Sequence, residues 1–171
     1  MVMHMKCLLF EDPDFGFLVI IEPQKGFQQE WEWEGNALLR LHEIVIPEIC
    51  QCLIVSKDRL PQDLTFRDAW KIGDAWEPVK IDFIQAEKTH RNRLCLAGFK
   101  KIYQLTQELE KAIKEQNLPL QVSLNRTIEI VSNIHNMNLT HCKTAEDLKY
   151  AIPRELHDVW DLYDPAPSTR T

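Results

Sequence analysis

The chain has 171 residues and a formal net charge of −6, so it is long enough for one domain, or one domain with an appendage, to bury a core without disulfide bonds. Residues 1–79 carry 14 acidic and 7 basic side chains while residues 80–101 carry 2 acidic and 6 basic ones, a balance that disfavours broad electrostatic capture of nucleic acid. The five cysteines are scattered without a CxxC pair, which predicts free thiols. No apolar run approaches the roughly 20 residues of a membrane span, and the first ten residues do not resemble a signal peptide. Together these features predict a cytoplasmic protein.

Two short apolar runs open the chain. Met5–Glu11 and Gly16–Glu22 are separated by the turn-forming residues 12–14, and the second run is rich in β-branched and aromatic side chains. They predict a β-hairpin that ends before Pro23, because proline cannot donate a hydrogen bond to a strand ladder.

The next segment mixes three patterns. In Gln24–Glu34, Trp31 and Trp33 alternate with glutamates, which places both indoles on one face of an extended stretch. A short helix is predicted over Ala37–Val45, and Ile49–Val55 is apolar enough to predict a central rather than an edge strand.

A second hairpin is predicted further on. Thr65–Ile72 and Glu77–Asp82 flank residues 73–75, where we expect Gly73 to adopt a positive φ. The stretch Phe66–Trp70 fits a helical turn or a strand, and we favour the strand.

The longest pattern runs from Asp82 to about Met137 and predicts two amphipathic helices that fold back on each other. Asp82 is placed to cap the first helix, and the break at residues 117–119 is too short for anything except a reversal of direction. Apolar residues recur every three or four positions, as expected for one face of a helix. In the first helix they are Cys95, Phe99, Ile102, Leu105, Leu109 and Ile113, and in the second they are Leu120, Leu124, Ile128, Val131 and His135.

Two short helices are predicted to follow. Thr144 and Asp147 resemble a capping box for a helix over Ala145–Ala151, and Pro153 can begin another over Arg154–Tyr163. Asp164–Thr171 is a polar, proline-bearing tail that we expect to be mobile.

These elements predict an α+β protein. A small mixed or antiparallel sheet with one short helix forms an N-terminal β-rich domain over residues 1–82. A long antiparallel helical hairpin and two short C-terminal helices form a second domain over residues 83–163, followed by a flexible tail over residues 164–171.

A search for chemistry finds no catalytic set. Cys50 and Cys52 lie on one face of a strand and are better explained as core thiols, and neither they nor His135, His141 and Cys142 have the spacing of a structural zinc site. Nothing in the sequence fixes a histidine as a base for a cysteine nucleophile, the clustered carboxylates of the N-terminal third fit a solvated surface, and the five glycines do not form a phosphate-binding loop. We therefore expect no enzyme activity, no cofactor and no metal.

A basic cluster, Lys88–Arg93, is the most suggestive local feature. On a helix, His90 and Arg93 share one face and Lys88 and Arg91 share the next. The cluster fits a solvated helical flank or an anchor for an acidic partner surface, and the acidity of the remaining chain disfavours DNA reading. Of the five tryptophans we expect most in the core and one or two exposed as interface anchors.

Two stretches carry a resemblance to a known family. The series Arg59-Leu60-Pro61-Gln62-Asp63-Leu64-Thr65-Phe66-Arg67-Asp68-Ala69-Trp70, followed by Val79-Lys80-Ile81-Asp82 and a helix with Ala86, His90 and Arg91-Asn92-Arg93-Leu94, is similar to a largely uncharacterised family of small phage and prophage proteins. Lys143–Pro153 resembles the ending of that family. The likeness covers about residues 41–153. It departs from the family pattern at Leu64, in the tryptophan-rich segment 24–34, and in the additional residues 154–171.

The resemblance implies a noncatalytic accessory protein of the phage tail or tail-fibre module, either a fibre-assembly chaperone or a minor tail component. Its partners are then other tail or fibre proteins, with self-association through the helical hairpin as a further expectation, and it is located in the host cytoplasm or built into the virion. The residues that we expect to bind a partner are Trp31, Trp33, Arg67, Trp70, His90, Arg91 and Arg93. The alternative is a regulatory or anti-defence protein that binds a host protein through the acidic N-terminal half.

Overall fold

The structure is a computed structural model that describes residues 6–14, 16, 18–22 and 52–160. The chain divides into two compact units, residues 1–82 and 83–171, which are described separately below. The first contains small antiparallel sheets and the second is helical, so the predicted α+β class is confirmed. The expected features of Gln24–Glu34, Ala37–Val45 and Asp164–Thr171 lie outside the described residues.

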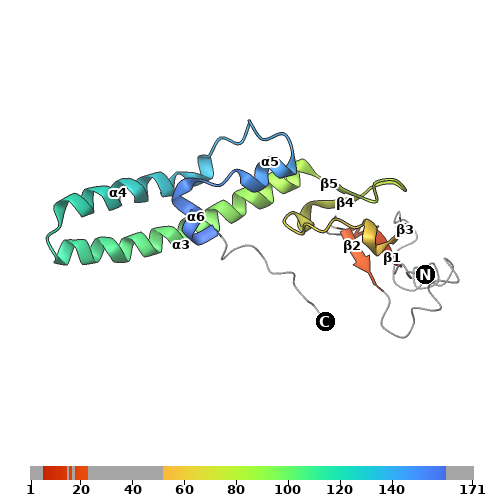
Figure 1. Ribbon diagram of the computed structural model, residues 1–171, viewed down its shortest axis with the longest axis horizontal. Helices are drawn as coiled ribbons and strands as arrows, with labels where there is room; N and C mark the ends of the chain where they lie inside the picture. Colours follow the sequence, from red (N-terminus) through yellow and green to blue (C-terminus); the bar gives the residue numbers. More distant parts are fainter. Residues whose placement is uncertain (1–5, 15, 17, 23–51, 161–171) are drawn as a thin grey trace. The chain divides into compact units, whose positions relative to one another are not determined.

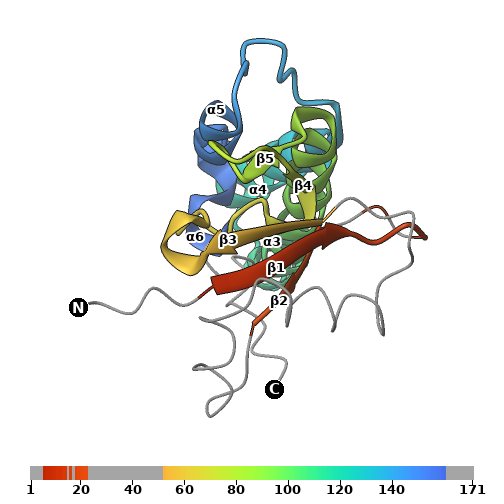
Figure 2. The ribbon, with the colours of Figure 1, turned by 90° about the vertical axis from the view of Figure 1, so that its right-hand side faces the viewer.

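The first unit contains a three-stranded antiparallel sheet with β1 (Lys6–Glu11) between β2 (Leu18–Ile21) and β3 (Cys52–Ser56), as Figure 2 shows. The predicted first hairpin is confirmed, because Leu8 pairs with Ile21. The predicted strand over Ile49–Val55 is confirmed for its described part, which pairs with β1; among the described strands no other pairs with β3, and its central position stays a prediction.

β1 takes the central position because both of its faces are apolar. Cys7 and Leu9 pack in one cluster, and Leu8 and Phe10 pack in another on the opposite face. Alternate side chains of a strand point to opposite faces, so four consecutive buried residues require cover on both sides.

A two-stranded antiparallel sheet completes the first unit, formed by β4 (Trp70–Ile72) and β5 (Val79–Ile81). Residues 66–70 are not a strand as favoured above: a 3₁₀ turn, η2 (Arg67–Ala69), precedes β4. A second 3₁₀ turn, η1 (Lys57–Arg59), follows β3. The Glu11 carboxylate accepts a hydrogen bond from the Ile72 amide at 2.9 Å, which ties β1 to β4.

The second unit is built on two long helices that run side by side, α3 (Phe83–Lys114) and α4 (Leu118–Ser132), as Figure 1 shows. The predicted hairpin and its break are confirmed. The side chain of Asn117 caps α4 by accepting a hydrogen bond from the Leu120 amide, and Pro119 lies in the first turn, where it needs no donor.

The predicted apolar stripe of α3 is confirmed in part, because Leu105 is buried and Ile102 and Leu109 pack against the core. Phe99 and Ile113 are exposed, whereas the buried residues of α3 are Ala86, His90, Leu94, Ala97, Gly98, Leu105 and Ala112. Small residues lie at the contact with α4 because they let the two backbones approach closely. A Cβ atom added at Gly98 would lie 3.3 Å from a methyl carbon of Ile134 and 3.7 Å from one of Val131.

Short elements complete the second unit: η3 (Ile134–Asn136), α5 (Ala145–Tyr150), η4 (Arg154–Leu156) and α6 (His157–Trp160). The predicted capping box is confirmed, since Thr144 and Asp147 exchange both hydrogen bonds at the start of α5. His135 is exposed rather than part of the apolar seam, and Ile134 takes the buried position instead. Leu156 and Val159 are buried against the α3–α4 core, and Tyr163 lies outside the described residues.

Candidate protein-binding surface

The turn between β4 and β5, residues 73–78, carries a solvent-exposed tryptophan, Trp76. Trp76 has 91% of its surface exposed, the largest fraction among the exposed hydrophobic side chains of the described residues. We call residues 73–78 the Trp76 turn.

Asp74 holds the backbone of this turn. One of its carboxylate oxygens accepts hydrogen bonds from the amides of Trp76 and Glu77, both at 2.9 Å, and the other lies 3.2 Å from Lys80 Nζ. The two amide hydrogen bonds, with the Lys80 contact, lower the pKa of Asp74 to about 2. The carboxylate is therefore charged, and the turn held, throughout the physiological pH range.

Two further contacts fix the turn. Gly73 is required for close approach rather than for the positive φ that we expected, because an added Cβ would lie 1.8 Å from the Glu77 carbonyl oxygen and the φ of Gly73 is not positive. Arg59 Nη2 donates to the Trp76 carbonyl oxygen at 2.5 Å, which anchors the tip of the turn to η1.

This arrangement combines an exposed indole with an ordered backbone. Tryptophan is the residue type most enriched among the side chains that dominate binding energy at protein interfaces. A backbone already held in place loses little conformational entropy when a partner binds. Chemically, the Trp76 turn can insert an aromatic anchor into an apolar pocket of another protein.

The other predicted partner-binding residues of the first unit have different surroundings. Arg67 is exposed in η2. Trp70 is only 2% exposed and packs in the core with Cys7 and Leu9, so a partner could reach it only if this unit opened. Trp31 and Trp33 lie outside the described residues. The sequence analysis expected one or two exposed tryptophan anchors but chose Trp70, which is buried, and missed Trp76, which is exposed.

His90 is a core residue of the second unit rather than a surface one. It is 1% exposed, its Nε2 lies 3.1 Å from the Ala151 carbonyl oxygen, and its ring meets the Trp160 ring edge to face at 5.5 Å. A carbonyl can only accept, so Nε2 donates. Burial is the main cause that lowers the pKa of His90, and the nearby Arg93 and Arg91 lower it further.

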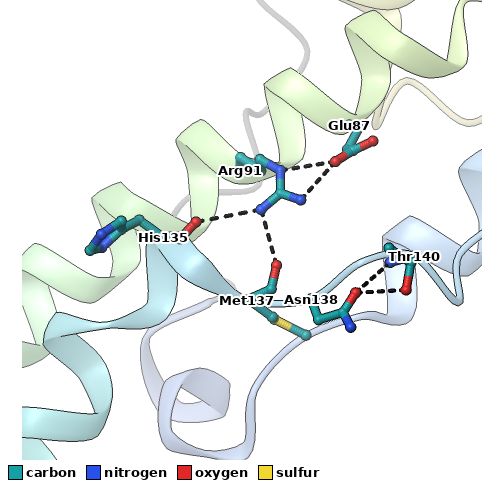
Figure 3. A network of polar contacts seen from close by, with 6 residues as sticks. All are labelled: Glu87, Arg91, His135, Met137, Asn138 and Thr140. Carbon is teal, nitrogen blue, oxygen red and sulfur yellow. Dashed lines mark hydrogen bonds and ion pairs between the residues drawn. The ribbon is translucent and has the colours of Figure 1, made fainter.

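Arg91 is engaged in internal contacts, which Figure 3 shows. Its guanidinium donates to Glu87 Oε1 at 2.9 and 2.7 Å and to the carbonyl oxygens of Met137 and His135 at 3.0 and 3.4 Å. These bonds attach the segment after α4 to α3, so Arg91 has a structural explanation that does not involve a partner. Arg93 is half-buried.

The outer face of α3 carries large apolar side chains that the sequence did not identify as exposed. Leu96, Phe99 and Tyr103 are spaced three and four residues apart and lie on the side of the helix opposite Leu94 and Leu105. Phe99 is 71% exposed although it was expected in the seam with α4. A contiguous exposed apolar patch is a feature of surfaces that bind other proteins.

The thiols of two cysteines are buried. Burial raises the pKa of Cys7 to about 11 and also raises the pKa of Cys142, so both are protonated at neutral pH and are poor nucleophiles. Within residues 6–14, 16, 18–22 and 52–160, no three His, Cys, Asp or Glu side chains are grouped as metal ligands, and no helix has the length and apolar character to cross a bilayer.

Comparisons with known proteins give no match to a family model, to a curated protein or to a solved structure.

Proposed function

We propose that this chain is a noncatalytic protein that acts by binding other proteins in the tail or tail-fibre module of a phage, as a fibre-assembly chaperone or a minor tail component. It needs no cofactor, and it works in the host cytoplasm or within the virion. The phage assignment depends on the resemblance of residues 41–153 described above.

The exposure of Trp76 is the observation that carries the binding role. An indole in water leaves a large apolar area hydrated, and the Trp76 turn holds this one outward through Asp74, Gly73 and Arg59. We assign Trp76 as the anchor, with the exposed guanidinium of Arg67 on the same unit available to orient an acidic partner.

The alternative of acidic mimicry has less support from the first unit. Several of its carboxylates are paired with lysines: Glu11 lies 3.7 Å from Lys71, Glu22 lies 2.6 Å from Lys57, and Asp74 lies 3.2 Å from Lys80. Paired carboxylates contribute little to a continuous negative face.

The test is co-expression with the fibre or tail protein encoded beside this chain, followed by a pull-down. The wild-type chain should retain that protein and raise the soluble fraction of the fibre. Trp76→Ala should weaken the affinity at least about 30-fold, since truncation of an interface hot spot costs about 2 kcal/mol or more.

Tyr150→Ala provides a matched control, because Tyr150 is also an exposed aromatic residue but lies on α5 of the other unit. It should leave the pull-down unchanged. The proposal fails if wild-type protein neither retains a tail or fibre protein nor changes fibre solubility, and the assignment of Trp76 fails if both variants behave like wild type.

A further inference from the structure

On the outer face of α3, side chains at similar distances before and after one central residue are complementary in character. We call this face the α3 ridge: it consists of exposed positions at steps of three or four residues, from Ile84 through Leu96, Phe99 and Tyr103 to Ile113. Steps of this size keep the positions on one side of a helix over its whole length. The ridge lies opposite the side that packs against α4.

Phe99 is the centre of the ridge. Leu96 lies three residues before it and Tyr103 lies four residues after it, so an apolar side chain flanks Phe99 in each direction. If a second copy of α3 lies antiparallel across the first with Phe99 facing Phe99, Leu96 of each copy faces Tyr103 of the other. This is the residue-to-residue reciprocity that a two-fold symmetric interface requires.

Two charged residues of the ridge lie at equal distances on either side of Phe99 and have opposite charges. Lys88 lies eleven residues before Phe99 and Glu110 lies eleven residues after it, and both are exposed. An antiparallel pair therefore brings each lysine to the glutamate of the other copy, at two places about 33 Å apart. A parallel pair would bring lysine to lysine and glutamate to glutamate, and like charges in register disfavour that arrangement.

The remaining ridge positions are also arranged in pairs at nearly equal distances from Phe99. Asn92 and Thr106 are each seven residues from Phe99, and Ile84 and Ile113 are fifteen and fourteen residues from it. Polar thus faces polar and apolar faces apolar along the ridge. A partner of unrelated sequence gives no reason for this match, whereas a second copy of the chain does.

We propose that the α3 ridge is the interface of an antiparallel homodimer, with the two-fold axis at Phe99. This inference goes beyond the proposed function and does not involve Trp76. The apolar centre has three large side chains per copy, Leu96, Phe99 and Tyr103, against the roughly 20–30 residues per side of a standard interface, so the dimer is expected to form in the micromolar range and to exchange.

Charge exchange on full-length protein tests the pairing without disturbing the core. At about 100 µM, sedimentation equilibrium should show a monomer–dimer equilibrium for the wild type. Lys88→Glu and Glu110→Lys should each weaken dimerisation about tenfold or more, since each brings like charges together at both ends. The double variant should restore dimerisation to near the wild-type level, because each copy again meets an opposite charge.

A second pair of variants tests the centre. Phe99→Asp should abolish the dimer, whereas Val122→Asp, at an exposed position of α4 off the ridge, should leave it intact. Unchanged far-ultraviolet circular dichroism confirms the fold of each variant, and if Phe99→Asp loses helix the charge-exchange series decides alone. A monomeric wild type at 500 µM, a double variant no better than the single ones, or a dimer insensitive to all ridge changes overturns the proposal.

Discussion

Two leucines only two positions apart on α3 offer a direct test of which side of the helix is buried. Leu94 is 1% exposed and belongs to the core formed with α4, whereas Leu96 is 52% exposed on the α3 ridge. Both sit well inside the helix, so Leu→Ala changes the same atoms in the same backbone setting. Only the surroundings of the two side chains differ.

The magnitude follows from those surroundings. Leu94→Ala removes a fully buried side chain and leaves a cavity among packed neighbours, which destabilises proteins by about 3 kcal/mol, within a range of 2–5 kcal/mol. Leu96→Ala removes a side chain that is half hydrated already, and alanine is at least as good a helix former, so the free energy of unfolding should change by about 0.5 kcal/mol or less.

Urea unfolding followed by circular dichroism at 222 nm measures this difference, because the described α-helices all lie in the second unit. A gap of about 2.5 kcal/mol moves the unfolding midpoint by about 1 M or more at typical slopes. The measurement belongs at about 0.1 µM protein, where a dimer of micromolar affinity is mostly dissociated. Equal losses for the two variants, or a larger loss for Leu96→Ala, would refute the assignment of the buried face.

Three other outcomes follow from the polar contacts of the second unit. Arg91→Met should lower the free energy of unfolding by about 1–2 kcal/mol, because the Met137 carbonyl loses a charged donor at a half-exposed site, and Arg91→Lys should lower it less. The pKa of His90 is lowered by burial, so the second unit should be most stable above pH 6.5 and lose stability as pH falls from 6.5 toward the folded pKa; urea midpoints between pH 7.5 and 5 should show this slope, and His90→Gln should flatten it. Thr144→Ala should cost about 1 kcal/mol through loss of the α5 cap, and because hydrogen bonds from the Lys143 amide and from Thr144 lower the pKa of Asp147, the contribution of that carboxylate should fade as pH drops below 3.8.

The ends of the helices could be predicted from sequence because local chemistry decides them. Asn117 before Pro119 stops one helix and caps the next, and Thr144 with Asp147 opens α5. These signals act within three or four residues, so no knowledge of the rest of the fold is needed to interpret them.

The buried side of α3 could be predicted only in part, through Ile102, Leu105 and Leu109, because the rest of it depends on what packs against the helix. Periodicity selected the larger side chains, including Phe99, as the seam. Besides Leu94 and Leu105, the actual seam uses Ala97, Gly98 and Ala112, whose small size lets α4 approach and which carry little apolar surface to mark them in a sequence pattern. The burial of His90 was not predicted for a related reason: its neighbours Ala151 and Trp160 lie more than 60 residues away in the chain.

Trp76, the exposed tryptophan of the first unit, was not identified from the sequence for a different reason. Trp70 lies in a strand of the predicted second hairpin and Trp76 lies in its turn, and the sequence of so short a hairpin does not reveal which indole is buried. The difference arises from the Asp74 and Gly73 contacts, which turn the backbone at residues 73–78 so that Trp76 points outward.

The apolar side chains of α3 are divided between the inner face, which packs against α4, and the outer face, which is exposed. Alanine and glycine share the inner face with Leu94 and Leu105, whereas Leu96, Phe99 and Tyr103 lie outside, where their hydrated apolar surface favours association. A helix whose role ended with packing on α4 would be at least as stable, and more soluble, with polar side chains at Leu96, Phe99 and Tyr103. Large apolar residues there therefore need a partner surface to explain them, and the reversed order of Lys88 and Glu110 around Phe99 indicates that this surface is a second copy of the ridge.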